Sequence, residues 1–225
     1  MKSLQITTIQ FPEIQLPTSA AHQLRGFFGN LFKEKSTLLH NHYEDGKSIY
    51  DYPVVQYKVI DKIPILLGIN VEEKLGANLL AELFLKIKHL DIKGTKYEIL
   101  NKNIQSSHQN IGIDDNELHE YEFKTLWMAL NQDKHKEYLR LEQNEKKKFL
   151  DKALTNNLVS LSKGVGYTLP KTIIAKTKLI EKQTLFKDQE MMAFAGTFVC
   201  NMQLPNLIGI GKSVSRGFGT VLREV

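Results

Sequence analysis

Two histidines one residue apart, His40 and His42, lie in the most polar stretch of the chain. If this stretch is extended, both imidazoles project to the same side, because strand side chains alternate with a period of two. Imidazole has an unperturbed pKa of about 6.5, so at neutral pH one histidine can accept a proton while the other donates one. The pair therefore predicts a loop with side chains suited to general acid–base chemistry.

This histidine pair has three interpretations. The first is a solvated polar loop without a chemical role. The second is a metal site, which needs a third ligand such as His22, His108 or Glu44, and the sequence has no CxxC or HExxH spacing to support one. The third is metal-free acid–base catalysis, with Tyr50 and Lys33 as a neighbouring hydroxyl and cation.

A second segment with chemical potential, the glycine-rich segment, lies near the end of the chain. It contains Gly209, Gly211, Lys212, Ser213, Ser215, Arg216, Gly217, Phe218 and Gly219. Glycine permits positive φ and lets a ligand approach the backbone amides, and the two cations supply charge, so the segment suits phosphate binding. There is no acidic residue between Met191 and Arg223.

The setting of the glycine-rich segment excludes two common phosphate motifs. It does not lead from a strand into a helix, as GxGxxG and P-loop sequences do, but into a terminal strand that begins near Thr220. A tight turn at a sheet corner is the alternative interpretation. Phe218, between two glycines and before a strand, could anchor that turn.

Composition indicates a soluble globular protein of 225 residues with 42% hydrophobic residues. The net charge of +5, from 30 basic and 25 acidic residues, permits a nucleic-acid partner without requiring one. The single cysteine, Cys200, excludes an intramolecular disulfide and lies in an apolar run, so we expect a buried thiol. No apolar run approaches the roughly 18 residues of a membrane span, and we expect a cytoplasmic location.

The first half of the chain predicts a ferredoxin-like order of elements. Apolar patterning indicates strands at 4–11, 49–60, 63–69 and 95–104, with helices at about 19–33 and 71–90. Asp61 and Lys62 separate two of these strands, a spacing that suits a two-residue hairpin. The resulting order, β-α-β-β-α-β, gives an antiparallel sheet with both helices on one face.

The second half repeats this order in part. The polar stretch 105–112 is the best candidate for a linker, and strands at 118–130, 173–186 and 191–203 surround a long helix at 133–161. The glycine-rich segment follows where a second helix is due. We therefore expect an α+β fold of two tandem ferredoxin-like (RRM-like) halves, a domain at 1–108 and a domain at 113–225, with the last helix replaced by the glycine-rich loop.

These features together resemble the CRISPR repeat-processing endoribonucleases of the RAMP superfamily, especially the branch with a paired-histidine active site. The resemblance covers most of the chain. It rests on the tandem order of elements, on His40 and His42 after the first helix, on Tyr50, and on the glycine-rich segment.

The resemblance implies a metal-independent cleavage of precursor CRISPR RNA within each repeat, by attack of the ribose 2′-OH on the adjacent phosphate. The products would carry a 5′-hydroxyl and a 2′,3′-cyclic phosphate. His40 and His42 match the acid and base positions, without an assignment of the two roles, and Tyr50 and Lys33 match a helper hydroxyl and a phosphate-stabilising cation. Lys35 could replace Lys33 in that role.

The resemblance also implies the binding partners. The RNA-binding residues would be those of the glycine-rich segment: Gly209, Gly211, Lys212, Ser213, Ser215, Arg216, Gly217, Phe218 and Gly219. No metal and no cofactor are expected. Precursor CRISPR RNA is the expected partner, with other CRISPR-associated effector subunits as further candidates, no membrane, and a monomer or homodimer.

Three other classes of protein stay open. A non-catalytic RAMP subunit that binds guide RNA in an effector complex would share the fold but would not need His40 and His42. An RRM-type module would carry an RNP motif, of which Arg216 to Gly219 matches only the start. A metal-dependent nuclease would lose its activity in EDTA.

Overall fold

The computed structural model of the protein describes residues 1–31, 52–186 and 189–224, which form two compact units. The N-terminal unit contains Ser3–Gln109 and Val214–Gly217. The C-terminal unit contains Met1–Lys2, Asn110–Ser213 and Phe218–Val225. Four residues of the glycine-rich segment therefore belong to the N-terminal unit. No helix among the described residues is long and apolar enough to cross a membrane.

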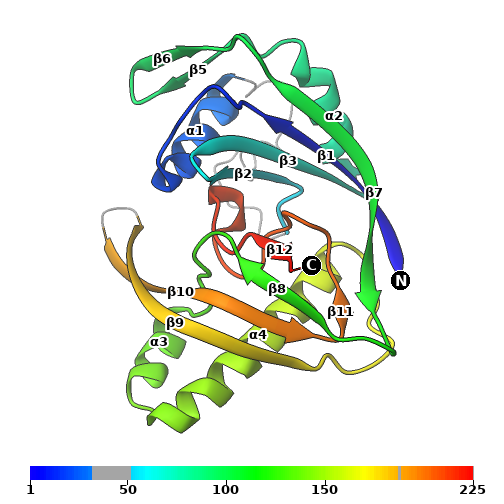
Figure 1. Ribbon diagram of the computed structural model, residues 1–225, viewed down its shortest axis with the longest axis vertical. Coiled ribbons are helices and arrows are strands. Elements are labelled where there is room, and N and C mark those ends of the chain that lie inside the picture. The colour runs from blue at the N-terminus through cyan, green and yellow to red at the C-terminus, as the bar shows by residue number, and fades with distance from the viewer. Residues whose placement is uncertain (32–51, 187–188, 225) are drawn as a thin grey trace. The chain divides into compact units, whose positions relative to one another are not determined.

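The N-terminal unit is built on an antiparallel sheet with the order β7-β1-β3-β2. Its strands are β1 (Lys2–Gln10), β2 (Val55–Ile60), β3 (Ile63–Val71) and β7 (Asn103–Ile113). The helical elements are η1 (Thr18–Ala20), α1 (Ala21–Leu31) and α2 (Gly76–Phe84), and the short strands are β4 (Lys74–Leu75), β5 (His89–Ile92) and β6 (Thr95–Glu98). This strand order is the ferredoxin-like one that the sequence predicts (Figure 1).

The turn between β2 and β3 confirms the predicted two-residue hairpin. Asp61 and Lys62 have φ values of 50° and 68°, the left-handed conformation that a type I′ turn requires at both central residues. The strands present Tyr57 and Leu66 to the core, where Phe28 of α1 stacks on Tyr57 with ring centroids 5.8 Å apart. This packing fixes α1 on the sheet beside β2.

The polar stretch at 105–112, predicted as a linker, contains the boundary between the two units at Gln109 and Asn110, but it forms part of strand β7. The predicted last strand, at 95–104, is also misplaced, because Thr95–Glu98 forms the separate hairpin β5-β6 and β7 pairs beside β1. Most residues of β7 before Ile111 are exposed. A strand with so little burial has a polar sequence, and hydrophobic patterning does not detect it.

The C-terminal unit repeats the same topology with one helix missing. Its sheet has the order β12-β8-β10-β9, formed by β8 (His119–Phe123), β9 (Ala175–Phe186), β10 (Gln189–Cys200) and β12 (Val221–Arg223). The glycine-rich segment and the short β11 (Met202–Gln203) lie between β10 and β12, where a ferredoxin-like fold has its second helix. The predicted fold class is therefore confirmed.

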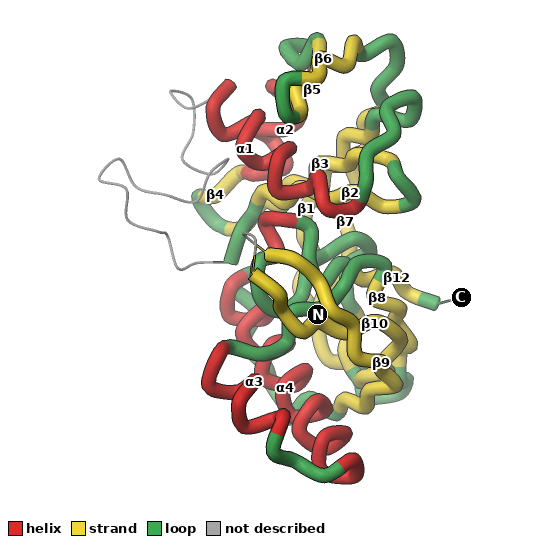
Figure 2. The backbone as a smooth tube through the Cα atoms, turned by 90° about the vertical axis from the view of Figure 1, so that its left-hand side faces the viewer, coloured by secondary structure: helices red, strands yellow, loops and turns green. Residues whose placement is uncertain are grey.

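Two helices, α3 (Gln132–Leu139) and α4 (Gln143–Gly164), replace the single long helix predicted at 133–161. The break is a capping box, in which the side chains of Glu142 and Glu145 accept hydrogen bonds from each other's backbone amides. Both helices lie on the same side of strands β9 and β10 (Figures 1 and 2). Cys200 is buried, as predicted, and burial raises the pKa of its thiol to about 12.

Candidate functional site

The two arms of the glycine-rich segment pair with each other within the C-terminal unit. The amide of Ile210 donates to the carbonyl of Gly219 at 2.8 Å, and Gly209 forms a bridge with Thr220. Gly211 and Gly219 have φ values of 93° and 66°. A Cβ at Gly211 would lie 2.6 Å from Trp127 Nε1, so glycine is required here for packing as well as for conformation.

Several amides of this segment are used inside the protein. Lys212 N–H donates to Met128 O at 3.0 Å, and Gly219 N–H donates to Leu126 O at 2.9 Å. Gly217 N–H donates to Val214 O at 3.1 Å. At these three positions the amides stabilise the turn, as in the sheet-corner interpretation, and a phosphate would have to be held by other groups.

The side chains of the segment are more accessible than these amides. Lys212 is exposed, and the side chains of four further predicted RNA-binding residues are half-buried: Ser213, Ser215, Arg216 and Phe218. Phe218 is thus not a core aromatic. The accessible side-chain groups of the segment are therefore its hydroxyls, its two cations and this ring.

The middle of the segment, η3 (Val214–Arg216), packs on α1 and β2 in the N-terminal unit. A Cβ on Gly217 would lie 2.6 Å from Ala21 Cβ of α1 and 3.1 Å from the Tyr57 carbonyl of β2. The close approach, with a φ of 91° at Gly217, explains the glycine at this position. Arg216 is therefore held beside the two elements that precede and follow residues 32–51 in the chain.

The predicted catalytic residues Lys33, His40, His42 and Tyr50 lie outside the described residues. The candidate third ligand Glu44 lies outside them as well, whereas His22 on α1 and His108 on β7 are exposed.

A second arginine, Arg25, interacts electrostatically with Arg216, and no pattern in the sequence indicates this pairing. Arg25 is on α1, and burial together with the positive charge of Arg216 lowers the pKa of its guanidinium. Burial also lowers the pKa of Arg216. Both guanidinium groups are half-buried, and the charge of Arg216 contributes to the lowered pKa of Arg25.

A buried lysine lies on β2 beneath η3. Lys58 Nζ donates to Gln56 Oε1 at 2.9 Å, and Gln56 Nε2 donates to Tyr52 Oη at 2.9 Å. Lys58 and Gln56 are fully buried, and burial lowers the pKa of Lys58 to about 7. A charged residue inside the apolar run 54–60 is the sequence signal for this network, which hydrophobic patterning alone does not reveal.

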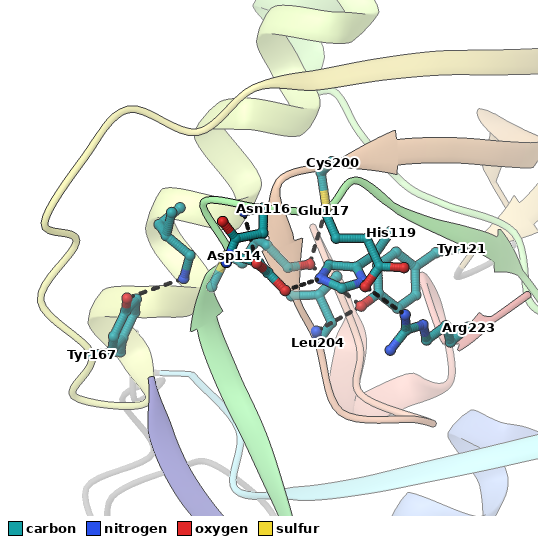
Figure 3. Close-up of polar contacts among 11 residues, drawn as sticks. Asp114, Asn116, Glu117, His119, Tyr121, Tyr167, Cys200, Leu204 and Arg223 are labelled. Carbon is teal, nitrogen blue, oxygen red and sulfur yellow. Dashed lines mark hydrogen bonds and ion pairs between the residues drawn. The ribbon is translucent and has the colours of Figure 1, made fainter.

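One group of histidine and carboxylate side chains in the described part of the chain could meet at a metal ion: Asp114, Glu117 and His119, whose ligand atoms lie within 4.8 Å of one another. The His119 ring lies between the two carboxylates, with Nε2 at 3.1 Å from Asp114 Oδ2 and Nδ1 at 3.8 Å from Glu117 Oε2 (Figure 3). Asp114 also accepts from Asn116 N–H, and Glu117 pairs with Arg223 at 3.5 Å. Protein groups thus account for both carboxylates.

The tandem ferredoxin-like topology is shared with a solved RAMP protein, which is 12% identical with a TM-score of 0.57 over 99% of this chain and 100% of that one. The sequence models of two domains match the chain, the Cas6b N-terminal domain over residues 2–110 and the Cas6b C-terminal domain over residues 112–224. The chain belongs to the Cas6b family. The predicted resemblance is therefore confirmed at the level of family.

Two solved structures agree with this assignment, and a curated relative is similar in sequence. A crystal structure of Cas6b is 34% identical with a TM-score of 0.93, over 99% of this chain and 100% of that one. A second, of the CRISPR RNA processing endoribonuclease Cas6b, is 31% identical with a TM-score of 0.80, again over 99% and 100%. An uncharacterized protein of Methanocaldococcus jannaschii is 34% identical over 147 residues, 64% of this chain and 98% of that protein.

Proposed function

We propose that this protein is an endoribonuclease that cleaves precursor CRISPR RNA within its repeats without a metal ion. The observation that carries the proposal is the position of η3, which brings Arg216 of the glycine-rich segment onto α1 and β2. These two elements bound the segment that contains the histidine pair. A structure of the same family, 31% identical, is that of a CRISPR RNA processing endoribonuclease, which supports the same substrate.

In the proposed reaction, one histidine of the pair His40 and His42 removes the proton from a ribose 2′-OH. The O2′–P bond forms, the P–O5′ bond breaks, and the other histidine gives a proton to the departing 5′ oxygen. The products are a 2′,3′-cyclic phosphate and a 5′-hydroxyl. Tyr50 and Lys33 act as a hydrogen-bond donor and a cation for the negative charge that develops on the phosphate.

The RNA backbone is bound in this proposal by the glycine-rich segment. Lys212 and Arg216 contribute charge, Ser213 and Ser215 contribute hydroxyl donors, and Phe218 contributes a face on which a base stacks. The glycines Gly209, Gly211, Gly217 and Gly219 shape the turn and allow its close packing. Arg25, on α1, adds a second guanidinium beside Arg216.

In this proposal the protein acts in the cytoplasm as a monomer or homodimer. Other CRISPR-associated effector subunits are its candidate partners. We propose the ranges 1–108 and 113–225 as its two domains, with Val214–Gly217 packing in the N-terminal unit and Met1–Lys2 in the C-terminal unit. The chemistry assigned to the histidines needs neither a cofactor nor a metal, since both proton transfers have a protein group to perform them.

The test is cleavage of a synthetic CRISPR repeat RNA by the purified protein in EDTA, with the product termini identified by mass spectrometry. We expect undiminished cleavage and the 2′,3′-cyclic phosphate and 5′-hydroxyl termini. Loss of cleavage in EDTA that returns with a divalent cation would instead establish a metal-dependent nuclease. Tight binding of the repeat without cleavage would establish a non-catalytic RAMP subunit.

A further inference from the structure

His119, the first residue of β8, is a buried histidine with an incomplete set of hydrogen bonds. Its side chain is 2% exposed, and Nε2 lies 3.1 Å from Asp114 Oδ2. The other ring nitrogen, Nδ1, has no hydrogen-bond partner in the described part of the chain. A buried polar atom that has lost its contact with water and gained none in the protein costs free energy. Nδ1 is therefore in a position that a bound group would complete.

The hydrogen bond to Asp114 assigns the tautomer of His119. A carboxylate accepts hydrogen bonds and donates none, so Nε2 carries the hydrogen and donates it to Asp114 Oδ2. In the neutral imidazole, Nδ1 then carries a lone pair. Asp114 Oδ1 accepts from the amide of Asn116 at 3.0 Å, which holds the carboxylate in place. A carboxylate that fixes one ring nitrogen, while the other keeps a lone pair, is the usual arrangement behind a metal-binding histidine.

Nδ1 faces a second carboxylate across a gap that is wider than a hydrogen bond. Glu117 Oε2 lies 3.8 Å from it (Figure 3). A nitrogen and an oxygen that share a tetrahedral zinc ion are about 3.4 Å apart, since each lies about 2.1 Å from the ion. The Glu117 side chain is 61% exposed, so its carboxylate can move by the small difference. The gap therefore has nearly the width that a metal ion requires.

Arg223 is the cation that lies beside this gap in the structure. Its Nη2 is 3.5 Å from Glu117 Oε2, and it forms no hydrogen bond with His119 Nδ1. The ion pair is partly exposed on both sides and contributes little to stability. With a neutral imidazole, the two carboxylates and one guanidinium have a net charge of −1, which favours a further cation. Such a cation would compete with Arg223 for Glu117.

A protonated His119 that only pairs with its two carboxylates is the alternative. A second hydrogen on Nδ1 would then be directed toward the carboxylate of Glu117. At 3.8 Å, Nδ1 and Glu117 Oε2 are too far apart for a hydrogen bond, although the exposed glutamate has room to approach. A proton on Nδ1 therefore leaves this nitrogen without a partner, whereas a metal ion would provide one.

We propose that His119 Nδ1 and Glu117 bind a zinc ion, with Asp114 as the acceptor that orients the imidazole and with water in the remaining positions. The ligand atoms of these three residues lie within 4.8 Å of one another, and all three residues belong to the C-terminal unit. Imidazole together with carboxylate suits zinc, whereas magnesium prefers oxygen ligands alone. With two protein ligands, the site binds zinc less tightly than a structural site with four.

The zinc ion would have a structural role, because it would link the connection between β7 and β8 to the start of β8. None of its ligands is among the residues proposed for cleavage or RNA binding. The inference is therefore independent of the proposed function, and EDTA should remove this ion without stopping cleavage.

The test is isothermal titration of the full-length protein with ZnCl₂ after treatment with EDTA and dialysis, together with melting curves with and without zinc. Glu117→Gln removes the charged ligand at an exposed position, where the fold should be kept. Glu120→Gln is the matched control, since Glu120 is also exposed and lies next to His119 on β8, with its side chain on the opposite face. Arg223→Gln removes the competing cation.

We expect one zinc ion per chain and a higher melting temperature of the parent in zinc. Glu117→Gln should bind zinc at least about tenfold more weakly, and Glu120→Gln should bind it like the parent. Arg223→Gln should bind zinc about threefold more tightly or better, because Glu117 is then released from its ion pair. Magnesium in excess should not displace the zinc ion.

Absence of zinc binding by the parent at about 1 mM ZnCl₂ would overturn the inference, since no stabilisation could then arise. Equal affinity in Glu117→Gln and the parent would overturn it as well. If the double variant His40→Ala with His42→Ala loses the zinc ion while Glu117→Gln keeps it, the ion belongs to the histidine pair and the site at His119 is refuted. Weaker binding in Arg223→Gln would contradict the proposed competition for Glu117.

Discussion

Gly219 and Ile210 face each other across the two arms of the glycine-rich segment. Ile210 N–H donates to the carbonyl of Gly219 at 2.8 Å, and a Cβ on Gly219 would lie 1.9 Å from the Ile210 carbonyl oxygen. The two arms therefore approach each other more closely than any residue other than glycine at position 219 would allow. Glycine is required here by packing, which is a structural reason independent of any ligand.

Gly219→Ala should therefore destabilise the protein by about 2–4 kcal/mol, because it combines a left-handed φ of 66° with an overpacked contact. Urea unfolding followed by circular dichroism measures the effect. Gly26→Ala is the matched control, since Gly26 is exposed on α1 and a Cβ there meets nothing within 4 Å. We expect that substitution to be neutral or to stabilise by up to about 1 kcal/mol. Equal effects of the two substitutions would contradict the packing argument.

Lys58 should make stability depend on pH. Burial lowers its pKa from 10.5 to about 7, so between these values the unfolded chain holds a proton that the folded protein has released. The unfolded state then binds more protons, and stability rises with pH across this window. Lys58→Met should remove that rise and should be more stable than the parent at pH 7, as judged from urea midpoints at pH 7, 8 and 9.

The control for this experiment is Lys86→Met, at an exposed position in the same unit, which should keep the rise. A rise of the same size in Lys58→Met would show that other groups cause it.

Arg216→Gln should weaken RNA binding about tenfold while leaving the fold intact, because it removes one of two adjacent half-buried guanidinium groups. Fluorescence anisotropy with repeat RNA measures the effect. Arg223→Gln offers a charge-matched comparison, since Glu117 at 3.5 Å already counters the charge of Arg223. The interpretation of Arg216 would fail if both variants lost the same affinity.

Local patterns in the sequence predicted those parts of the fold that local physics determines. The Asp61-Lys62 turn was predictable because two residues between apolar strands leave few turn types, and the stripe containing Leu24 and Phe28 predicted α1 because helical spacing repeats along the chain. The glycines of the glycine-rich segment predicted that no helix would form before β12. These features together gave the correct fold class.

Features that depend on contacts distant in sequence were not predictable in the same way. Strand β7 is polar because most of it is exposed, and only its pairing beside β1 reveals it as a strand. The contact of Gly217 with Ala21 and Tyr57 joins the end of the chain to its beginning. The same holds for the neighbours Arg25 and Arg216, which come from separate elements.

The central claim is that the histidine pair makes this Cas6b protein a nuclease. The most direct measurement is single-turnover cleavage of repeat RNA by the double variant His40→Ala with His42→Ala, at saturating protein, alongside its affinity for the same RNA. General acid–base catalysis contributes about 10²- to 10⁴-fold for each group. We therefore expect no detectable cleavage, with an affinity within about threefold of the parent, since the residues proposed to bind phosphate are unchanged. Cleavage by the double variant at the parental rate would contradict the assignment.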